Sequence, residues 1–234
     1  MKILAIIPAR GGSRSVPKKN IKKLNGKPLI AYSIEEAKRS KFIDRLVVST
    51  DSKEIAKVSK KYGAEVPFLR PAELAQDNTT DLPVFKHAVK WLKDNEGYVP
   101  DIIVHLRPTA PLRKANHIDE GIKLLIGDKD ADSVRSVCEP SQNPYKMWRI
   151  KKRYLVSILN AKGKTESFNM PRQKLPKVYW QNASVDVVRY DTIIKKNSMT
   201  GDNILPLFME AKYSVDLDTE FDFKIAEEII KTGV

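Results

Sequence analysis

Short apolar runs alternate with amphipathic helical segments along the first two thirds of the chain, and this alternation constrains the fold more than any other feature. Residues 2–8, 45–49 and 102–106 are rich in isoleucine, leucine and valine, as is typical of strands buried on both faces. Segments 28–40 and 115–126 carry apolar side chains at helical spacing. The alternation predicts an α/β fold with a mainly parallel sheet, helices on both of its faces and right-handed crossovers.

Further elements are expected along the same chain. The pattern predicts a short third strand at 65–68 and a helix that begins at Asp81. Towards the end of the chain, strands are expected at 180–188 and 205–209, followed by a closing helix at 219–231.

The alternation breaks at residues 139–178. This stretch has scattered prolines, few periodic runs and five cations within residues 146–153. It has too little periodic apolar sequence to form a core of its own, yet it contains large apolar side chains: Met147, Trp148, Tyr154, Leu155 and Ile158. We therefore predict one domain over residues 1–234 with a hairpin arm at about 139–178. We expect this arm to pack on a second copy in a C₂ homodimer.

Charge and cysteine content limit the partners and the compartment. The chain has 42 Lys and Arg against 29 Asp and Glu, a net charge of +13, and its first 34 residues hold eight cations and no acid. Both a nucleic acid and a small polyanion such as a nucleoside triphosphate fit this balance. The single cysteine, Cys138, excludes a disulfide framework and suits a reducing compartment. With no apolar run long enough for a signal peptide or a membrane span, we expect a soluble, cytoplasmic protein without a membrane partner.

A basic, glycine-containing loop follows the first expected strand. Residues 7–20 read IPARGGSRSVPKKN, and this position is where open α/β sheets bind ligands. The loop is neither a Walker A sequence nor a dinucleotide fingerprint. Gly11 and Gly12 allow the backbone to approach a ligand closely, and exposed N–H groups beside several cations favour anions. The loop is therefore a candidate phosphate-binding site.

Two carboxylates stand close together near the end of the chain. In Asp216-Leu217-Asp218, both acidic side chains project from one face if the segment is extended. Paired carboxylates suit a hard cation such as Mg²⁺ that also takes triphosphate oxygens, and Mn²⁺ would fit the same ligands. Alternatively, Asp216 ends a strand and Asp218 stabilises the N-terminus of the next helix.

The loop sequence IPARGGSRSVPKKN resembles the signature of the acylneuraminate cytidylyltransferases, the CMP-sialic acid synthetases. Six further strings match in the same order and span nearly the whole chain: STDS, LRPAELAQD, LRPTAPLR, PRQKLP, QNASVDV and VDLDTEFDF. The resemblance implies a Rossmann-like nucleotidyltransferase sheet, CTP and an acidic nine-carbon sugar as substrates, and a dimer formed through the arm.

The same resemblance implies roles for individual residues. Arg10 and Lys19 would grip the triphosphate, with Lys19 stabilising charge at the α-phosphorus; Arg10, Lys19 and Asp218 are the catalytic candidates. The nucleotide-binding candidates are Ala9, Arg10, Gly11, Ser13, Lys19, Asn20, Arg70, Thr80 and Asp81, of which Arg70 and the Thr80–Asp81 region would face the cytidine. Asp216 and Asp218 would bind the magnesium.

Sugar binding is expected from two regions. Pro108 and Thr109 would lie beside the sugar, whereas Lys146, Arg172 and Gln173 of the arm would reach it from the same or a neighbouring subunit. Three positions depart from the pattern familiar in enzymes for N-acetylneuraminate: Arg107 replaces a glutamine, Ala183 a glycine and Asp186 a tyrosine.

These departures all fall on the sugar side. We expect Arg107 and Asp186 to contact the sugar and to favour a different nonulosonic acid, of the legionaminic or pseudaminic type. Alternatively, Arg107 and Asp186 form a structural ion pair with each other.

The sequence thus predicts transfer of CMP from CTP to the anomeric hydroxyl of a nine-carbon α-keto sugar acid, with release of pyrophosphate. Asp216, Asp218 and a metal-bound water remain alternatives for the base that removes the hydroxyl proton. A CMP-Kdo-type synthetase is the nearest alternative. A basic nucleic-acid-binding module is the non-enzyme alternative, although we expect no nucleic acid as a partner.

Overall fold

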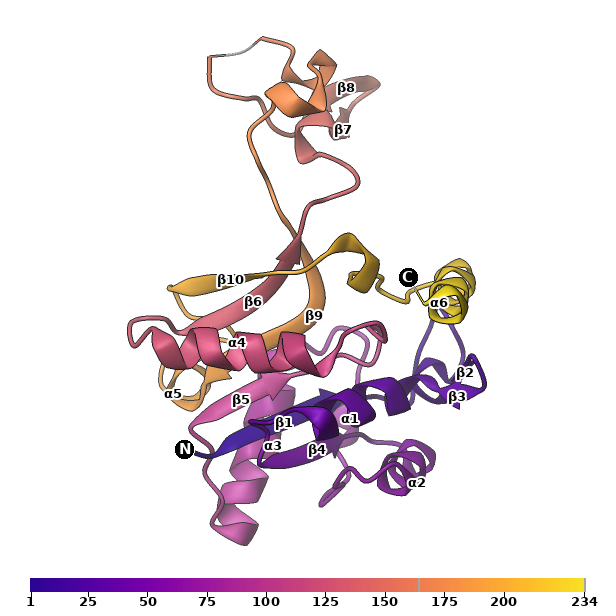
Figure 1. Ribbon diagram of the computed structural model, residues 1–234, viewed down its shortest axis with the longest axis vertical. Coiled ribbons are helices and arrows are strands. Elements are labelled where there is room, and N and C mark those ends of the chain that lie inside the picture. Colours follow the sequence, from indigo (N-terminus) through magenta and orange to yellow (C-terminus); the bar gives the residue numbers. More distant parts are fainter. Residues whose placement is uncertain (164, 234) are drawn as a thin grey trace.

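The computed structural model describes residues 1–163 and 165–233. Within these residues, six strands form one sheet in the order β10-β6-β9-β5-β1-β4 (Figure 1). The strands are β1 (Ile3–Pro8), β4 (Arg45–Ser49), β5 (Ile102–His105), β6 (Ser133–Cys138), β9 (Trp180–Arg189) and β10 (Ile204–Phe208). Strands β4, β1 and β5 are mutually parallel, as are β6 and β10, whereas β9 runs antiparallel to both β5 and β6. The mainly parallel α/β sheet expected from the sequence is confirmed, with one reversed strand.

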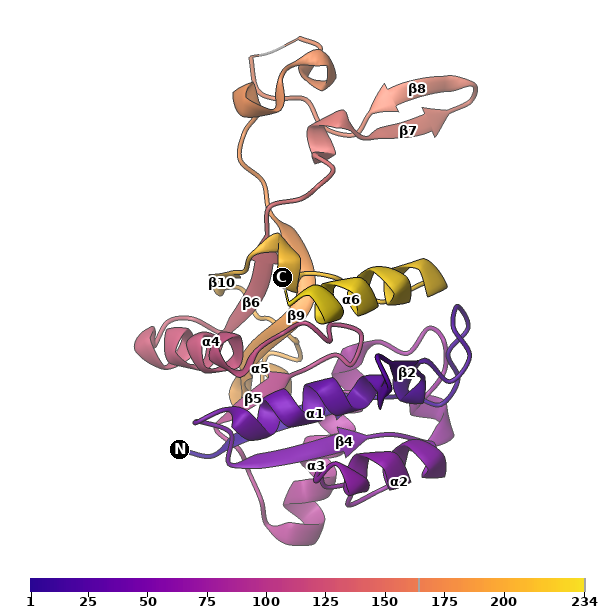
Figure 2. The same ribbon diagram turned by 45° about the vertical axis from the view of Figure 1, so that its right-hand side comes forward.

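Helices cover both faces of the sheet. Along β1, Ile3, Ala5 and Ile7 belong to one apolar cluster, and Leu4 and Ile6 to another. This division follows from the two-residue period of a strand buried on both sides. The first cluster includes side chains of α1 (Leu29–Arg39), α2 (Lys53–Lys61) and α4 (Ala115–Gly127); the second includes side chains of α3 (Asp81–Glu96) and α5 (Tyr190–Ile194). Figure 2 shows α1 and α3 on opposite sides of the sheet.

The closing helix α6 (Glu220–Thr232) packs away from the sheet, beside the small hairpin of β2 (Lys23–Leu24) and β3 (Lys27–Pro28) (Figure 1). Phe223 and Leu217 join Val16 and Leu24 in a third apolar cluster. Thr219 caps the helix: its hydroxyl accepts the Asp222 N–H, and the Asp222 carboxylate accepts the Thr219 N–H. The C-terminal segment is therefore docked on the loop that follows β1.

The expected strand at 65–68 is absent. Glu65 forms only an isolated parallel bridge with Val47. Pro67 follows two residues later and has no N–H to continue a ladder, so the chain leaves the sheet edge there.

Residues 139–163 and 165–179 form the described part of the arm, which leaves the sheet after β6 and returns at β9. It carries an antiparallel hairpin of β7 (Trp148–Lys151) and β8 (Tyr154–Ser157), together with short 3₁₀ turns. In both views the arm projects well beyond the sheet, on the opposite side from α2 and α3 (Figures 1 and 2).

Candidate active site

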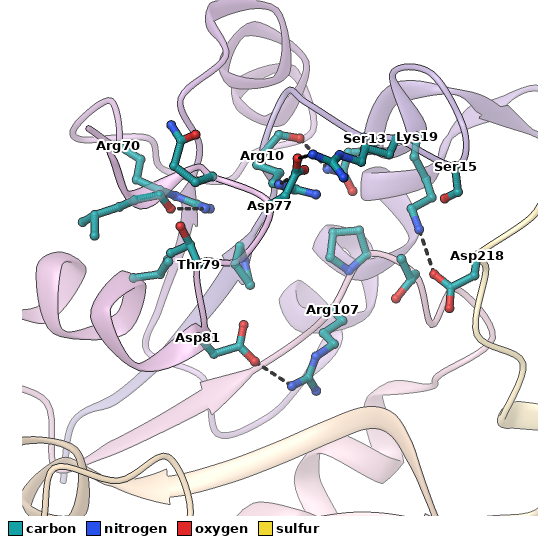
Figure 3. Close-up of a pocket in the computed structure, with 18 residues that line it drawn as sticks. Arg10, Ser13, Ser15, Lys19, Arg70, Asp77, Thr79, Asp81, Arg107 and Asp218 are labelled. Atoms are coloured by element: carbon teal, nitrogen blue, oxygen red, sulfur yellow. Dashed lines mark hydrogen bonds and ion pairs between the residues drawn. The ribbon is translucent and has the colours of Figure 1, made fainter. Parts of the chain in front are cut away.

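A basic cavity lies beyond the carboxyl ends of β1 and β5. Its volume is about 430 Å³. Most of the polar side chains that line it come from the loop after β1, from the segment before α3, from the loop after β5 and from the approach to α6: Arg10, Ser13, Arg14, Ser15, Lys19, Asn20, Arg70, Asp77, Thr79, Asp81, Arg107, Thr109 and Asp218 (Figure 3). Five cations stand among these residues against three carboxylates, so the cavity favours an anionic ligand.

The cations of the loop after β1 are paired with an acid across the cavity. Arg10 donates to the Asp77 carboxylate at 2.7 Å, and Arg14 pairs with the second oxygen of the same group. Asp77 therefore joins the segment before α3 to the phosphate-loop candidate, where Figure 3 shows it beside Arg10.

The Lys19 ammonium group is held at the opposite wall of the cavity. Its Nζ donates to the Leu217 carbonyl at 2.9 Å and to Asp218 Oδ1 at 3.0 Å. The side chain of Lys19 is only 13% exposed, whereas that of Asp218 is 71% exposed. A well-fixed cation thus faces an accessible carboxylate.

Three other loop residues set the shape of the backbone. The Gly11 N–H donates to Asp51 Oδ1 at 2.8 Å, and a Cβ at Gly11 would lie 3.1 Å from Ser52 Cβ, so close approach favours glycine here. Asn20 Nδ2 donates to the Arg10 carbonyl at 3.0 Å. Ala9 is buried in the core cluster beneath the loop. Of these three candidates, only Asn20 lines the cavity.

The nucleoside-side candidates are only partly brought together. Arg70 is buried and lines the cavity; its Nε donates to Ser49 Oγ at 3.1 Å and its Nη1 to the Leu74 carbonyl at 3.3 Å. Burial lowers the pKa of Arg70 from its usual value. Asp81 lines the cavity at the start of α3, whereas Thr80 does not; Thr79 takes its place in the wall.

Arg107 lines the cavity together with Pro108 and Thr109, the other two residues expected to meet the sugar there. Its Nη2 donates to Asp81 Oδ2 at 2.9 Å and its Nη1 to Asp186 Oδ2 at 2.9 Å. Burial alone would lower the pKa of Arg107, but the charges of Asp186 and Asp81 prevail and raise it. The ion pair between Arg107 and Asp186, one of the two alternatives left by the sequence, is therefore present.

Asp216 and Asp218 approach the cavity from the segment before α6. Asp218 lines the cavity, whereas Asp216 is half-buried and is not one of the lining residues. Within the described residues, Asp216 Oδ1 is buried without a hydrogen-bond partner. Burial raises the pKa of Asp216, although a hydrogen bond from Thr109 opposes the shift.

Four sugar-side candidates lie outside this cavity. Asp186 is buried beneath Arg107 and does not form part of the wall, so its expected direct contact with the sugar is not supported within this chain. Lys146, Arg172 and Gln173 lie on the projecting arm, where Arg172 and Gln173 line a separate cavity of about 230 Å³. The physical reason is the length of the arm, which carries these side chains away from the sheet.

Several residues of the wall, above all Arg14 and Asp77, were given no binding role from the sequence, although Arg14 is one of the cations of the basic loop. Both were visible in strings already recognised: Arg14 within the basic loop, and Asp77 as the last residue of LRPAELAQD. The missing signal was their pairing, because the two residues are 63 positions apart and a sequence pattern does not report such contacts.

Together, the doubly covered, mainly parallel sheet, the cationic cavity at its carboxyl edge and the nearby carboxylate pair define the class of nucleotidyltransferases, enzymes whose chemistry is charge neutralisation and positioning of phosphates.

Comparisons with known proteins specify the class further. The sequence matches the family "Cytidylyltransferase" over residues 4–168. It is 37% identical over 231 residues to "Post-translational flagellin modification protein B" of Campylobacter coli, covering 98% of this chain and 95% of that protein. It is also 37% identical over 231 residues to "CMP-N,N'-diacetyllegionaminic acid synthase" of Campylobacter jejuni, covering 97% and 94%. The chain belongs to the cytidylyltransferase family.

A solved structure supports the fold independently. The CMP:2-keto-3-deoxy-manno-octonic acid synthetase complexed with CTP superposes with a TM-score of 0.73, covering all of both chains at 15% sequence identity. At this identity the match defines the fold alone. No helix among the described residues is long and apolar enough to cross a membrane.

Proposed function

We propose that the protein transfers CMP from CTP to a nine-carbon α-keto sugar acid. The anomeric hydroxyl oxygen attacks the α-phosphorus and gives its proton to Asp216, Asp218 or a water. The bond from that phosphorus to the bridging oxygen of the β-phosphate breaks, and pyrophosphate leaves with that oxygen. The main support for the proposal is the cationic cavity. Arg10, Lys19 and Arg107 all line it, and each is held in place by an ion pair with a carboxylate. Near-full-length similarity to a CMP-N,N'-diacetyllegionaminic acid synthase supports the choice of substrates.

The loop after β1 would bind the triphosphate. Arg10 and Arg14 would exchange the Asp77 carboxylate for phosphate oxygens, while Ser13 adds a hydroxyl donor. Lys19, held by the Leu217 carbonyl, would stabilise charge that develops at the α-phosphorus. The buried Arg70 guanidinium at the other wall would meet the cytidine.

A divalent cation fits the Asp216–Asp218 pair. Among the described residues, Asp216 Oδ1 is buried without a hydrogen-bond partner, and Asp218 two positions later is accessible; both are oxygen ligands of the kind Mg²⁺ or Mn²⁺ takes. Within the described residues, no group of three or more His, Cys, Asp or Glu side chains could hold a metal ion. Asp216 and Asp218 would therefore share the cation with the triphosphate. When bound, the cation supplies charge neutralisation at the phosphate oxygens.

The sugar would lie between Lys19 and Arg107, beside Pro108 and Thr109. Arg107 donates one N–H to Asp186 and one to Asp81, and its remaining N–H groups would meet a carboxylate or an acyl carbonyl of the sugar, for which a glutamine amide has fewer donors. This supports a sugar acid of the legionaminic or pseudaminic type in place of N-acetylneuraminate.

We further propose a homodimer formed through the arm. The β7–β8 hairpin leaves large apolar side chains in solvent, with Ile150 76%, Leu155 63% and Tyr154 60% exposed. Exposed apolar groups on one projecting element favour burial against a partner. A second copy would cover them and could bring Lys146, Arg172 and Gln173 to a sugar. Light scattering should give twice the 26.6 kDa subunit mass; a mass of one subunit at micromolar concentration would contradict the dimer.

We place the reaction in the cytoplasm, since the one cysteine is free and buried, as a reducing compartment allows. A nucleic-acid-binding role is the weaker alternative, because the cations of the cavity line a concave site and are paired with carboxylates. Kdo is the weaker substrate, since a relative 37% identical over nearly the whole chain is a CMP-N,N'-diacetyllegionaminic acid synthase, which takes a nine-carbon acid.

The function is tested by offering the purified protein CTP, UTP, ATP and GTP with Mg²⁺ and N,N'-diacetyllegionaminic acid, and identifying the product by mass spectrometry. The proposal predicts a CMP-sugar from CTP, abolished by EDTA. A sugar nucleotide carrying another base, or tight salt-dependent nucleic-acid binding without any product, would overturn it.

A further inference from the structure

A row of polar side chains crosses three neighbouring strands beside the cavity. His105 of β5 is directly opposite Asp186 of β9, and Asp186 is directly opposite Arg135 of β6. Figure 1 shows these three strands side by side. Arg107 follows His105 by two positions, so the row continues into the cavity wall.

Asp186 is shared between two guanidinium groups. Its Oδ2 accepts from Arg107 Nη1 at 2.9 Å and its Oδ1 from Arg135 Nε at 3.0 Å. The side chain of Asp186 is only 4% exposed, so these charge-assisted bonds replace hydration. Arg135 is itself oriented by Gln181, which accepts from its Nη1 at 3.2 Å.

Among the described residues, no cation besides Arg107 and Arg135 donates to this carboxylate. His105 Nδ1 lies 3.9 Å from Asp186 Oδ2, too far for a hydrogen bond. Burial first, and the charge of Arg107 second, lower the pKa of His105 well below its usual value, so the imidazole is neutral. The charge of Asp186 is balanced by Arg107 and Arg135.

This balance fixes the direction of Arg107. Its Nη1 donates to Asp186 and its Nη2 to Asp81 at the start of α3, so the guanidinium lies between these two carboxylates in the cavity wall. Without Arg135, the buried Asp186 carboxylate would have one free oxygen and only Arg107 to satisfy it. A bidentate pair would then draw the guanidinium towards β9 and away from Asp81 and the cavity.

We propose that Arg135 is a positioning residue for the sugar acid, acting through Asp186 to hold Arg107 in the cavity wall. This inference rests on the proposed function. Arg135 does not line the cavity, so its effect on the sugar is indirect. Its removal should therefore weaken sugar binding much more than CTP binding, since the triphosphate side of the cavity is built from other segments and the nucleoside side meets Arg107 only through Asp81.

The test compares Arg135→Gln and Arg135→Lys with the wild type, using CTP, Mg²⁺ and N,N'-diacetyllegionaminic acid. A matched control is Arg45→Gln. Arg45 also lies on a strand of the sheet and pairs with two carboxylates, Glu65 and Glu96, but it does not line the cavity and none of its partners does. Loss of a charge-assisted contact predicts a KM for the sugar acid about tenfold higher in Arg135→Gln, with the KM for CTP within about twofold. Arg135→Lys should be intermediate, and Arg45→Gln should change neither constant.

A double variant separates positioning from a general loss of stability. If Arg135 acts through Arg107, Arg107→Gln with Arg135→Gln should bind the sugar acid no more weakly than Arg107→Gln alone. Additive losses, an equal rise in both KM values, or an unchanged sugar KM in both Arg135 variants would overturn the proposal. If the wild type forms no CMP-sugar from any nine-carbon acid, both the proposed function and the positioning role are refuted. An active wild type with insensitive Arg135 variants refutes the positioning role alone.

Discussion

Lys19 and Asp218 are 199 residues apart in the chain, yet Lys19 Nζ lies 3.0 Å from Asp218 Oδ1. The contact joins the loop after β1 to the segment before α6. The same two segments also pack together in the apolar cluster that contains Val16, Leu24, Leu217 and Phe223. The candidate phosphate loop and the candidate metal ligands thus form one structural unit. This relationship explains how a cation and a carboxylate pair from opposite ends of the chain can act on the same phosphate.

Replacing Lys19 by alanine should reduce kcat by about 10²–10³, the loss typical when one donor to developing charge is removed. The KM for CTP should change much less, because Arg10 and Arg14 remain in place. Stability should fall by only about 1–2 kcal/mol, so the variant should stay folded. Steady-state pyrophosphate release measures both constants.

Lys18→Ala is the matched control for that variant. Lys18 is adjacent but exposed and pairs with Glu54, outside the cavity. Near-normal kcat in Lys19→Ala, or an equal loss in Lys18→Ala, would remove Lys19 from the mechanism.

Replacing Asp216 by asparagine should raise the stability of the metal-free protein and lower its activity. Burial raises its pKa above that of an unfolded aspartate, so the folded protein binds more protons between the two values. The metal-free protein therefore loses stability as pH rises through this interval and stays at the lower level above it. Asp216→Asn should raise Tm at pH 7 in EDTA, by about 2–4 °C for each kcal/mol relieved, and the gain should disappear near pH 4.

The same Asp216→Asn variant should lose most of its Mg²⁺-dependent activity, since an amide lacks the charge of the carboxylate. Calorimetry at several pH values checks the stability, and pyrophosphate release the activity. A gain in Tm that is constant with pH, or activity equal to the wild type, would argue against a buried, ionised ligand.

Arg107→Gln should change the ranking of sugar acids. We expect the ratio of kcat/KM between N,N'-diacetyllegionaminic acid and N-acetylneuraminate to shift by about 1–3 kcal/mol, tenfold or more, towards N-acetylneuraminate. The KM for CTP should be little changed. An unaltered ranking would mean that Arg107 serves only as a structural ion-pair partner of Asp186.

Ala183 occupies a left-handed backbone conformation, with φ of 54°. The strand pairing of β6 and β9 shifts register around it, and Asn182 is anchored beside it by Ser136 and Ser214. A Cβ in this region costs about 1–2 kcal/mol, whereas glycine costs about 0.5–1 kcal/mol in chain entropy. Ala183→Gly should therefore stabilise the protein by about 0.5–1 kcal/mol in urea unfolding. Ala56→Gly, inside α2, should instead destabilise it, and a loss of stability in both variants would refute strain at Ala183.

Much of the fold was predictable because periodicity depends on local burial. The runs that became β1, β4 and β5 are apolar on both faces, and their sequence patterns carry that fact directly. The reversal of β9 was not visible, since the direction of a strand depends on the path of the chain through the arm. The predicted strand at 65–68 was wrong for a local reason. Pro67 has no N–H to continue a ladder, and this outweighed the apolar side chains around it.

The parts of the candidate site that come from one short segment each were predictable. The loop after β1 and the Asp216–Asp218 pair are both local strings, and the structure brings Lys19 and Asp218 together. Ion pairs between distant segments were not predictable. Examples are the pair of Asp77 with Arg10 and the pair of Arg135 with Asp186, the carboxylate that also binds Arg107. Such pairs depend on strand register and loop packing, which a single sequence does not encode in any short pattern.

The proposed substrate preference is tested by measuring pyrophosphate release with different sugar acids at fixed CTP and Mg²⁺. The panel would contain N,N'-diacetyllegionaminic acid, pseudaminic acid, N-acetylneuraminate and the eight-carbon acid Kdo. We expect kcat/KM to be highest for a diamino nine-carbon acid, lower for N-acetylneuraminate and lowest for Kdo. Fastest turnover of Kdo, or pyrophosphate release that does not depend on any of these acids, would contradict this expectation.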